Sequence, residues 1–213
     1  MPGIEGISSR PLIVASTNTG IINSKTVINC AGIFADKLNN MVSDNKIKII
    51  PKRGQYYLLD KTVGDLVNTI IFQCPTSKGK GVVVSPTVHG NLIVGPDSEI
   101  IEDKQDTSTS QERLKHVLDT ARKSVSSIPF NQVITTFAGV RSEPETGDFI
   151  VEEVIDAPGF VNVAGIKSPG LSASPAIASY VVDMVEEIFN KIEIKNNYNP
   201  IRRKVIRFNE LSD

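Results

Sequence analysis

Two side chains, Arg141 and His89, are of types that could act on a small anionic molecule. Arg141 follows the stretch FAGV at 137–140, and its planar guanidinium can hold a carboxylate or phosphate through paired hydrogen bonds. His89 precedes Gly90 in an expected turn, and a histidine that titrates near neutrality can accept the proton of a hydroxyl group. The plain alternatives are a surface arginine at a strand end and a solvated histidine in a turn. For His89 the sequence favours the plain alternative.

The stretch FVNVAGIKSPGLSASPAIA at 160–178 has the pattern of a cofactor-binding connection. An apolar strand is followed by a glycine-bearing loop and then by a helix, predicted to begin with Ser174 as N-cap and Pro175 as its first residue. Backbone N–H groups at a helix start lack intrahelical partners, and the positive end of the helix dipole lies there. The pattern is typical both of a site for an anionic or dipolar cofactor and of an ordinary strand–loop–helix connection, and this stretch alone does not decide between them.

Further motifs occur in an order typical of one family. They are TVINCAGIFAD at 26–36, PKRGQYY at 51–57, SPTVHGNLIVG at 85–95 and FAGVRS at 137–142. Together with 160–178 they resemble the FAD-dependent oxidoreductases of the D-amino-acid oxidase superfamily, over about residues 26–185. The sequence is most similar to flavin-dependent glycerol-3-phosphate dehydrogenases of the anaerobic type and to L-2-hydroxyglutarate oxidases, which move a hydride from an alcohol carbon to the flavin. An amino-acid oxidase of the same superfamily is a further alternative.

The resemblance implies FAD as cofactor, held by the backbone of two turns. Glycine in such turns lets the backbone approach the flavin ring closely, although the same glycines could only permit tight turns. The residues expected to contact the cofactor are Ala31, Gly32, Gly165, Ile166, Ser168, Gly170 and Leu171.

The resemblance also implies a site for a small anionic substrate. Arg141 is expected to bind the acidic group, with Arg53 and Tyr56 as weaker candidates because their segment lies near the flavin in the family. Lys167 is expected beside the flavin, where its charge would favour the reduced, anionic form. By resemblance, a lysine at this position favours glycerol 3-phosphate as the predicted substrate. Relatives often have other polar residues in the turn that contains His89. The resemblance therefore gives only weak support to a catalytic role for His89.

The sequence lacks the strand–Gly-x-Gly-x-x-Gly–helix unit that holds the FAD pyrophosphate in this family. We therefore expect an α/β (α+β) fragment that is inactive alone, with an incomplete FAD-binding lobe at 1–50 and 159–195. A β-rich, mainly antiparallel substrate-binding lobe is expected at 51–158. The tail at 196–213 resembles the segment that leads to an iron–sulfur domain in relatives, and is expected to point toward a missing C-terminal domain. The alternative is a non-catalytic subunit that binds a small anion.

Composition narrows the possible partners of the 213-residue chain. Its net charge of −1 argues against binding to nucleic acid, and no apolar run approaches the roughly 18 residues of a membrane span. The two cysteines have no metal-like spacing, and we expect no metal and a cytoplasmic protein. Two further expectations concern a longer enzyme that contains this chain. It could associate peripherally with a membrane, and it could pass electrons to an acceptor subunit or to a quinone.

Hydrophobic periodicity predicts the elements that position these residues. A hairpin of two strands, 11–16 and 21–28, is expected around the turn at 18–20. The helix after Pro175 is expected to bury Ile177, Val181, Met184, Val185, Ile188 and Phe189. The other predicted helices are 33–42 and 110–126, and the other predicted strands are 47–50, 55–60, 68–73, 81–86, 91–95, 132–138 and 149–153.

Overall fold

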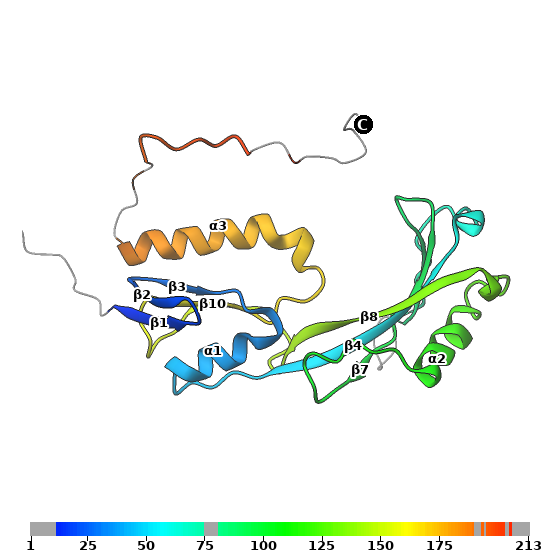
Figure 1. The fold of residues 1–213 in the computed structure, drawn as a ribbon, viewed down its shortest axis with the longest axis horizontal. Coiled ribbons are helices and arrows are strands. Elements are labelled where there is room, and N and C mark those ends of the chain that lie inside the picture. Colours follow the sequence, from blue (N-terminus) through cyan, green and yellow to red (C-terminus); the bar gives the residue numbers. More distant parts are fainter. Residues whose placement is uncertain (1–11, 75–80, 190–192, 194, 203–204, 206–213) are drawn as a thin grey trace, which may run out of the picture.

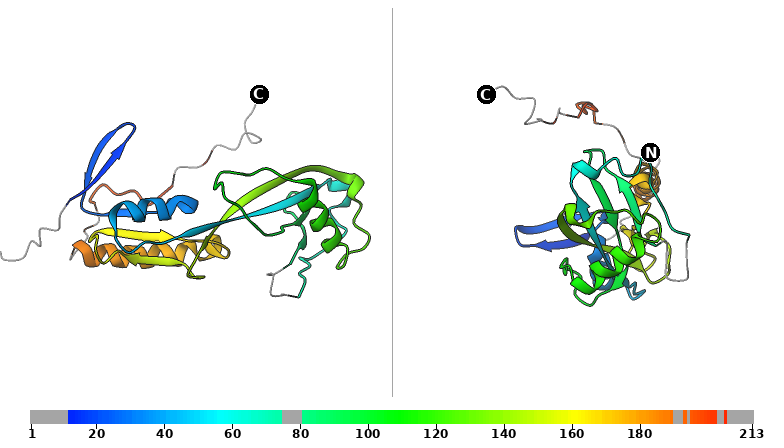
Figure 2. Two further views of the ribbon diagram at one scale, coloured as in Figure 1. Left: turned by 90° about the horizontal axis from the view of Figure 1, so that it is seen from below. Right: turned by 90° about the vertical axis from the view of Figure 1, so that its right-hand side faces the viewer.

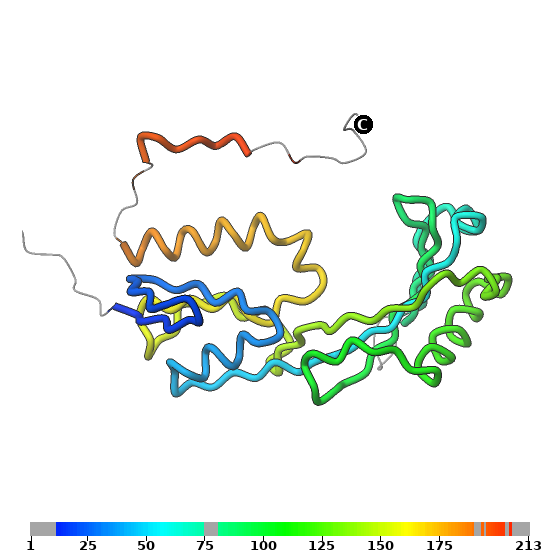
Figure 3. Tube along the Cα trace, in the orientation of Figure 1, coloured from blue at the N-terminus to red at the C-terminus, as the bar shows by residue number. Residues whose placement is uncertain are grey.

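The computed structural model describes residues 12–74, 81–189, 193, 195–202 and 205. Two long antiparallel strands, β4 (Ile49–Leu59) and β8 (Val133–Pro144), join a helix-covered region at one end of the molecule to a β-rich region at the other (Figure 1). The Cα trace leaves the first region along β4 and returns along β8 (Figure 3). The fold is mixed α/β with mainly antiparallel pairing, as predicted.

A three-stranded sheet forms the helix-covered region. Its order is β3 (Val27–Asn29), β10 (Phe160–Ala164) and β9 (Ile150–Glu153), with β3 parallel and β9 antiparallel to β10. Helix α3 (Gly170–Phe189) covers one face, and α1 (Ala35–Val42) with the short 3-10 helix η1 (Gly32–Phe34) lies on the other (Figure 1). Because strand side chains alternate, Val161 packs against α3 while Ala164 packs against Ala35 of α1.

The core side of α3 confirms the predicted helical periodicity. Val181 and Ile188 are buried there against Val161, and Ile177, Met184 and Val185 pack around them. Phe189 is the exception, because its side chain at the end of the helix is exposed.

The predicted hairpin is present as β1 (Ile13–Thr17) and β2 (Gly20–Ser24). It projects away from the rest of the protein (Figure 2). The second strand was expected to continue to residue 28, but the hairpin ends at Ser24 and the chain then enters β3 in a different sheet.

The β-rich region is a five-stranded sheet in which β4 pairs with β6, β7 and β8. Its remaining strands are β5 (Val83–Pro86), β6 (Leu92–Gly95) and β7 (Glu99–Ile100). Helix α2 (Gln111–Ala121) is capped by Ser110, whose hydroxyl accepts a hydrogen bond from Arg113 N at 3.3 Å. The helix packs Val117 and Ala121 into the core. The buried core of this region comprises Leu59, Val82, Val84, Leu92, Val94, Val117, Ala121 and Ile128.

Strand β4 corrects one sequence prediction. Lys52, Arg53 and Gly54 were expected to interrupt two strands, but they continue a single strand. The reason is non-local, because β8 pairs with β4 through this stretch and satisfies its backbone groups. The strand predicted at 68–73 is reduced to one bridge between Ile71 and Val84.

The start of α3 is a second correction. The helix begins at Gly170 rather than after Ser174, and Pro175 lies inside it. Proline lacks the N–H that would bond to the carbonyl of Leu171, and the Ser174 hydroxyl donates to that oxygen instead, at 2.8 Å. The first turn of α3 therefore lies directly against the loop that follows β10.

The division into two lobes stays a prediction. Strand β9 was assigned to the substrate-binding lobe, yet it pairs with β10 in the helix-covered sheet. Most of the tail at 196–213 lies outside the described residues.

Candidate active site

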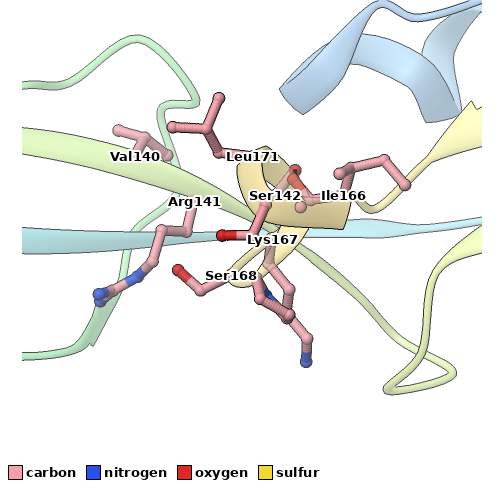
Figure 4. A pocket seen from close by; sticks show the side chains of 10 residues that line it. Val140, Arg141, Ser142, Ile166, Lys167, Ser168 and Leu171 are labelled. Atoms are coloured by element: carbon pink, nitrogen blue, oxygen red, sulfur yellow. Dashed lines mark hydrogen bonds between the residues drawn. The ribbon is translucent and has the colours of Figure 1, made fainter. Parts of the chain in front are cut away.

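A cavity of about 400 Å³ lies where β8 meets the start of α3 (Figure 4). Strand β8 contributes Val140, Arg141 and Ser142, and the loop after β10 with the first turn of α3 contributes residues 166–172. The side chains of Arg141 and Lys167 extend to the same side in Figure 4, while Val140 and Leu171 lie on the other. The chain thus brings together two cations that are far apart in the sequence.

Close packing holds the loop against the end of β8. The Ser142 hydroxyl donates to the carbonyl of Ile166 at 3.1 Å. Gly165 has a φ of +67°, and a Cβ there would lie 2.7 Å from the Pro144 ring. A larger residue at 165 would be strained and would push the loop away from β8.

Arg141 has a half-buried side chain, and its Nη2 donates to the backbone carbonyl of Asp97 at 3.0 Å. Among the residues that the structure describes, no carboxylate lies within ion-pair distance of Arg141, whereas Arg53, Arg113, Lys104 and Lys167 all have one. A neutral carbonyl orients the guanidinium without neutralising it. The charge of Arg141 is therefore not balanced by a carboxylate of the described residues, and a guanidinium in that state can bind an anion.

Lys167 differs from Arg141 because its charge is balanced. Its Nζ lies 2.5 Å from Glu143 Oε1, which is also 3.7 Å from Lys52 Nζ. Burial alone would raise the pKa of Glu143, but the hydrogen bond from Lys167 and the charges of the two lysines outweigh it and leave the pKa below its ordinary value. Glu143 therefore stays ionised beside Lys167 at neutral pH.

Tyr56 lies on the same side of the sheet as Arg141, because Tyr56 and Lys52, the cross-strand partner of Arg141, are an even number of residues apart on β4. Its ring stacks on Phe137 with centroids 4.9 Å apart and an interplanar angle of 8°. Burial raises the pKa of the Tyr56 phenol, an effect that Arg141 opposes and Asp97 supports. The phenol is therefore neutral at physiological pH and can act as a hydrogen-bonding group.

Arg53 does not reach the cavity. It alternates with Lys52 on β4 and so points to the opposite side of the sheet from Arg141. The residue is only 7% exposed, and its side chain contacts Glu99 at 2.8 Å, Asp106 at 2.5 Å and Ser108 at 2.9 Å. These contacts secure the loop after β7 rather than leaving the guanidinium open to a substrate.

His89 is also apart from the cavity. It is exposed in the turn between β5 and β6, next to the Leu59 end of β4, whereas Arg141 pairs with Lys52. Those two points on β4 are separated by about 23 Å, taking a rise of roughly 3.3 Å per residue. The structure therefore does not place His89 with Arg141 and Lys167.

The turn at Ala31 and Gly32 leads into η1, which contacts both β4 and β8. Gly32 is exposed with a φ of +55°, and a Cβ there would meet no atom within 4 Å. The backbone is accordingly open to close approach by a ligand.

Buried asparagines that the sequence analysis did not identify support this turn. Asn29 Nδ2 donates to Asn162 Oδ1 at 2.9 Å, and Asn162 Nδ2 donates to Asn39 Oδ1 at 2.8 Å. Asn29 Oδ1 also accepts from the N–H of Ala31 at 3.3 Å. Asparagines 29 and 162 each interrupt an apolar strand sequence, and this was a signal that could have revealed them.

Within the described part of the chain, no cluster of three or more His, Cys, Asp or Glu residues is placed to hold a metal ion. None of the helices in that part has both the length and the apolar character needed to cross a membrane.

Comparison with known proteins gives a consistent result. Glycerol 3-phosphate dehydrogenase of Caloramator mitchellensis is 57% identical over 197 residues, covering 92% of this chain and 41% of the relative. The mitochondrial L-2-hydroxyglutarate dehydrogenase of Arabidopsis thaliana is 29% identical, covering 74% of this chain and 37% of the relative. The chain thus spans about two fifths of the length of these relatives.

A solved structure has a similar fold. Dithionite-reduced L-alpha-glycerophosphate oxidase from Mycoplasma pneumoniae with FAD bound superposes with a TM-score of 0.72 at 34% identity, covering 83% of this chain and 46% of that one. The family model described as FAD dependent oxidoreductase (DAO) matches residues 3–184. The matched residues include β8, the loop after β10 and the start of α3, which together line the cavity. The chain therefore belongs to the FAD-dependent oxidoreductase family.

Proposed function

We propose that this chain supplies the substrate-binding part, and a portion of the flavin-binding part, of an enzyme that oxidises glycerol 3-phosphate. The observation that carries the proposal is Arg141, which lines the cavity and has no carboxylate partner in the described chain. A phosphate monoester would provide the missing negative charge, and its oxygens match the donors of the guanidinium.

The residues around the cavity fit a flavin. Leu171 is 92% exposed on the first turn of α3, where a planar ring could cover its side chain, and the backbone at Gly32 is open. We propose that FAD is held by the turn at Ala31 and Gly32 and by residues 165–171. When bound, FAD accepts a hydride from the alcohol carbon of the substrate.

The chain's own side chains would bind and orient the substrate. Arg141 holds the phosphate, and the neutral phenol of Tyr56 lies on the same side of the sheet and can donate a hydrogen bond. The residues found to line the cavity include no histidine, aspartate or glutamate. We therefore place the base that takes the hydroxyl proton outside this lining, and the role predicted for His89 stays a prediction.

The choice of glycerol 3-phosphate over 2-hydroxyglutarate rests on the relatives. The relative named for glycerol 3-phosphate is 57% identical to the chain, and the one named for L-2-hydroxyglutarate is 29% identical. Lys167 lines the cavity and would attract the anion of either compound, with part of its field balanced by Glu143, so that its charge does not favour one of the two. The electron acceptor, either a protein subunit or a quinone, stays a prediction.

The proposal is tested by steady-state kinetics on the FAD-loaded enzyme that contains this chain. The two candidate substrates are compared by reduction of the flavin absorbance without oxygen and by kcat/KM with an artificial acceptor. We expect kcat/KM for glycerol 3-phosphate to exceed that for L-2-hydroxyglutarate by at least about a hundredfold, as expected for a site built around one anion. Equal values, or stabilisation by phosphate with no flavin reduction by either compound, would contradict the proposal. The second result would favour a non-catalytic anion-binding subunit.

A further inference from the structure

We infer that Gly54, Pro96 and Asp97 form a seat for the guanidinium of Arg141, which is thereby held in one position at the edge of the cavity before any substrate binds. This inference rests on the proposed function, in which Arg141 binds the anion of the substrate. It assigns a positioning role to the glycine of the PKRGQYY motif, while the neighbouring Arg53 points away from the cavity.

The register of β4 and β8 places the side chain of Arg141 across Gly54. Arg141 pairs with Lys52 and Gly139 pairs with Gly54, so that these four residues face the same side of the sheet. A Cβ at Gly54 would lie 3.0 Å from Nη2 and 3.1 Å from Nη1 of Arg141. It would also lie 2.8 Å from Cβ of Pro96. The guanidinium thus occupies the space that any side chain at position 54 would need.

Asp97 completes the seat through two separate groups. Its backbone carbonyl accepts the hydrogen bond from Arg141 Nη2 at 3.0 Å. Its carboxylate is buried and accepts from Gln55 N at 2.8 Å and from Arg113 Nε at 2.5 Å. The carbonyl that orients Arg141 is therefore held by β4 on one side and by α2 on the other.

The carboxylate and the backbone carbonyl of Asp97 have different partners, and this difference affects the charge of Arg141. Because Arg113 pairs with the carboxylate, the contact offered to Arg141 is a neutral oxygen, and the positive charge of Arg141 remains available. A long side chain that is already ordered loses less conformational freedom when an anion binds. The seat should therefore increase affinity for the anionic part of the substrate and leave the reaction at the alcohol carbon largely unaffected.

Gly54→Ala in the FAD-loaded enzyme tests the seat, and Gly139→Ala is the matched control. Gly139 is the cross-strand partner of Gly54, but a Cβ there would meet no atom within 4 Å. We expect Gly54→Ala to raise the Kd of inorganic phosphate and the KM of glycerol 3-phosphate about tenfold, the value of one weakened charge-assisted contact. We expect kcat, the flavin spectrum and kcat/KM for uncharged glycerol to change less than about threefold, and Gly139→Ala to resemble the wild type.

Arg113→Ala provides a second test of the seat. Unlike Gly54→Ala, it introduces no new atom close to Pro96. Arg113 lies on α2 and holds the Asp97 carboxylate, so that its loss should raise the Kd of phosphate about threefold by loosening the carbonyl. The exposed Lys115 on the same helix is the control. If Gly54→Ala yields no folded protein, the phosphate Kd of Arg113→Ala decides the question.

Arg141→Ala is measured in the same series so that two failures can be distinguished. If Arg141→Ala leaves the phosphate Kd unchanged, the proposed function itself is wrong. If Arg141→Ala weakens phosphate binding but Gly54→Ala does not, only the seat is wrong. Equal effects of Gly54→Ala and Gly139→Ala would also overturn the seat, because crowding of the sheet surface would then explain both.

Discussion

Glu143 Oε1 lies 2.5 Å from Lys167 Nζ, and this ion pair joins β8 to the loop that leads into α3. The two residues are 24 positions apart in the sequence, yet the pair lies beside the cavity that contains Arg141. Lys52 on β4 approaches the same carboxylate at 3.7 Å. The contact therefore links both central strands to the proposed flavin loop.

The ion pair of Glu143 with Lys167 should make the stability of the folded protein depend on pH in the acidic range. Because the pKa of Glu143 is below its ordinary value of 4.5 in the folded protein, the contribution is complete above that value and disappears as pH falls through the folded pKa. We expect Glu143→Gln to be less stable than wild type at pH 7, with a difference that shrinks below about pH 4.5. Urea unfolding at a series of pH values measures this difference. A constant difference from pH 7 to pH 3 would show that the charge of Glu143 does not contribute.

Lys104 makes a second link, between the loop after β7 and the helix-covered region. Its Nζ lies 2.6 Å and 2.7 Å from the two carboxylate oxygens of Asp36 and 2.9 Å from the carbonyl of Ile33. Lys104→Met should destabilise the protein by about 2 kcal/mol, because a largely buried carboxylate loses its partner. The free energy of unfolding in urea measures the effect.

The double variant Lys104→Met/Asp36→Asn is the control for that prediction. It removes the unpaired charge together with the lysine, and should therefore lose less stability than the sum of the two single variants. Additive losses would mean that Lys104 and Asp36 do not interact favourably.

The buried asparagines should be equally sensitive to substitution. Asn162→Ala removes one hydrogen-bond partner from each of Asn29 and Asn39, whose side chains are buried, and should cost about 2–3 kcal/mol of unfolding free energy. The exposed Asn131 is the matched control, and Asn131→Ala should change the unfolding free energy by less than about 0.5 kcal/mol. Equal stabilities of the two variants would exclude a stabilising role for the asparagine network.

Local sequence patterns predicted much of the fold. The apolar spacing in α3 identified the residues of its core side except Phe189, which is exposed, and the turn at 18–20 identified the hairpin. The continuity of β4 through Gly54 could not be predicted, because it depends on pairing with β8 more than 80 residues later in the chain. The early start of α3 was missed because Ser174 and Pro175 are favourable at a helix start, whereas here Ser174 compensates for a proline inside the helix.

The candidate site was predicted only in part, because residue types can be read from the sequence but contacts between distant segments cannot. Arg141 and the loop at 165–171 were identified from their residue types, and the structure brings them to one cavity. Arg53 also looked suitable for an anion, but its partners Glu99 and Asp106 are 46 and 53 positions away. Charge balance between distant segments therefore decides which arginine is available, and a single sequence does not contain that information.

Substitution of Arg141 decides whether this side chain binds the substrate. In the FAD-loaded enzyme, Arg141→Ala should raise the KM for glycerol 3-phosphate about a hundredfold, the value of a lost charged hydrogen-bonded contact. Flavin content should stay intact, and Lys115→Ala, a charge removal on the exposed side of α2, should leave KM unchanged. An unchanged KM in Arg141→Ala would show that the one cavity-lining cation without a carboxylate partner in the described chain does not bind the substrate, and the proposed function would be wrong.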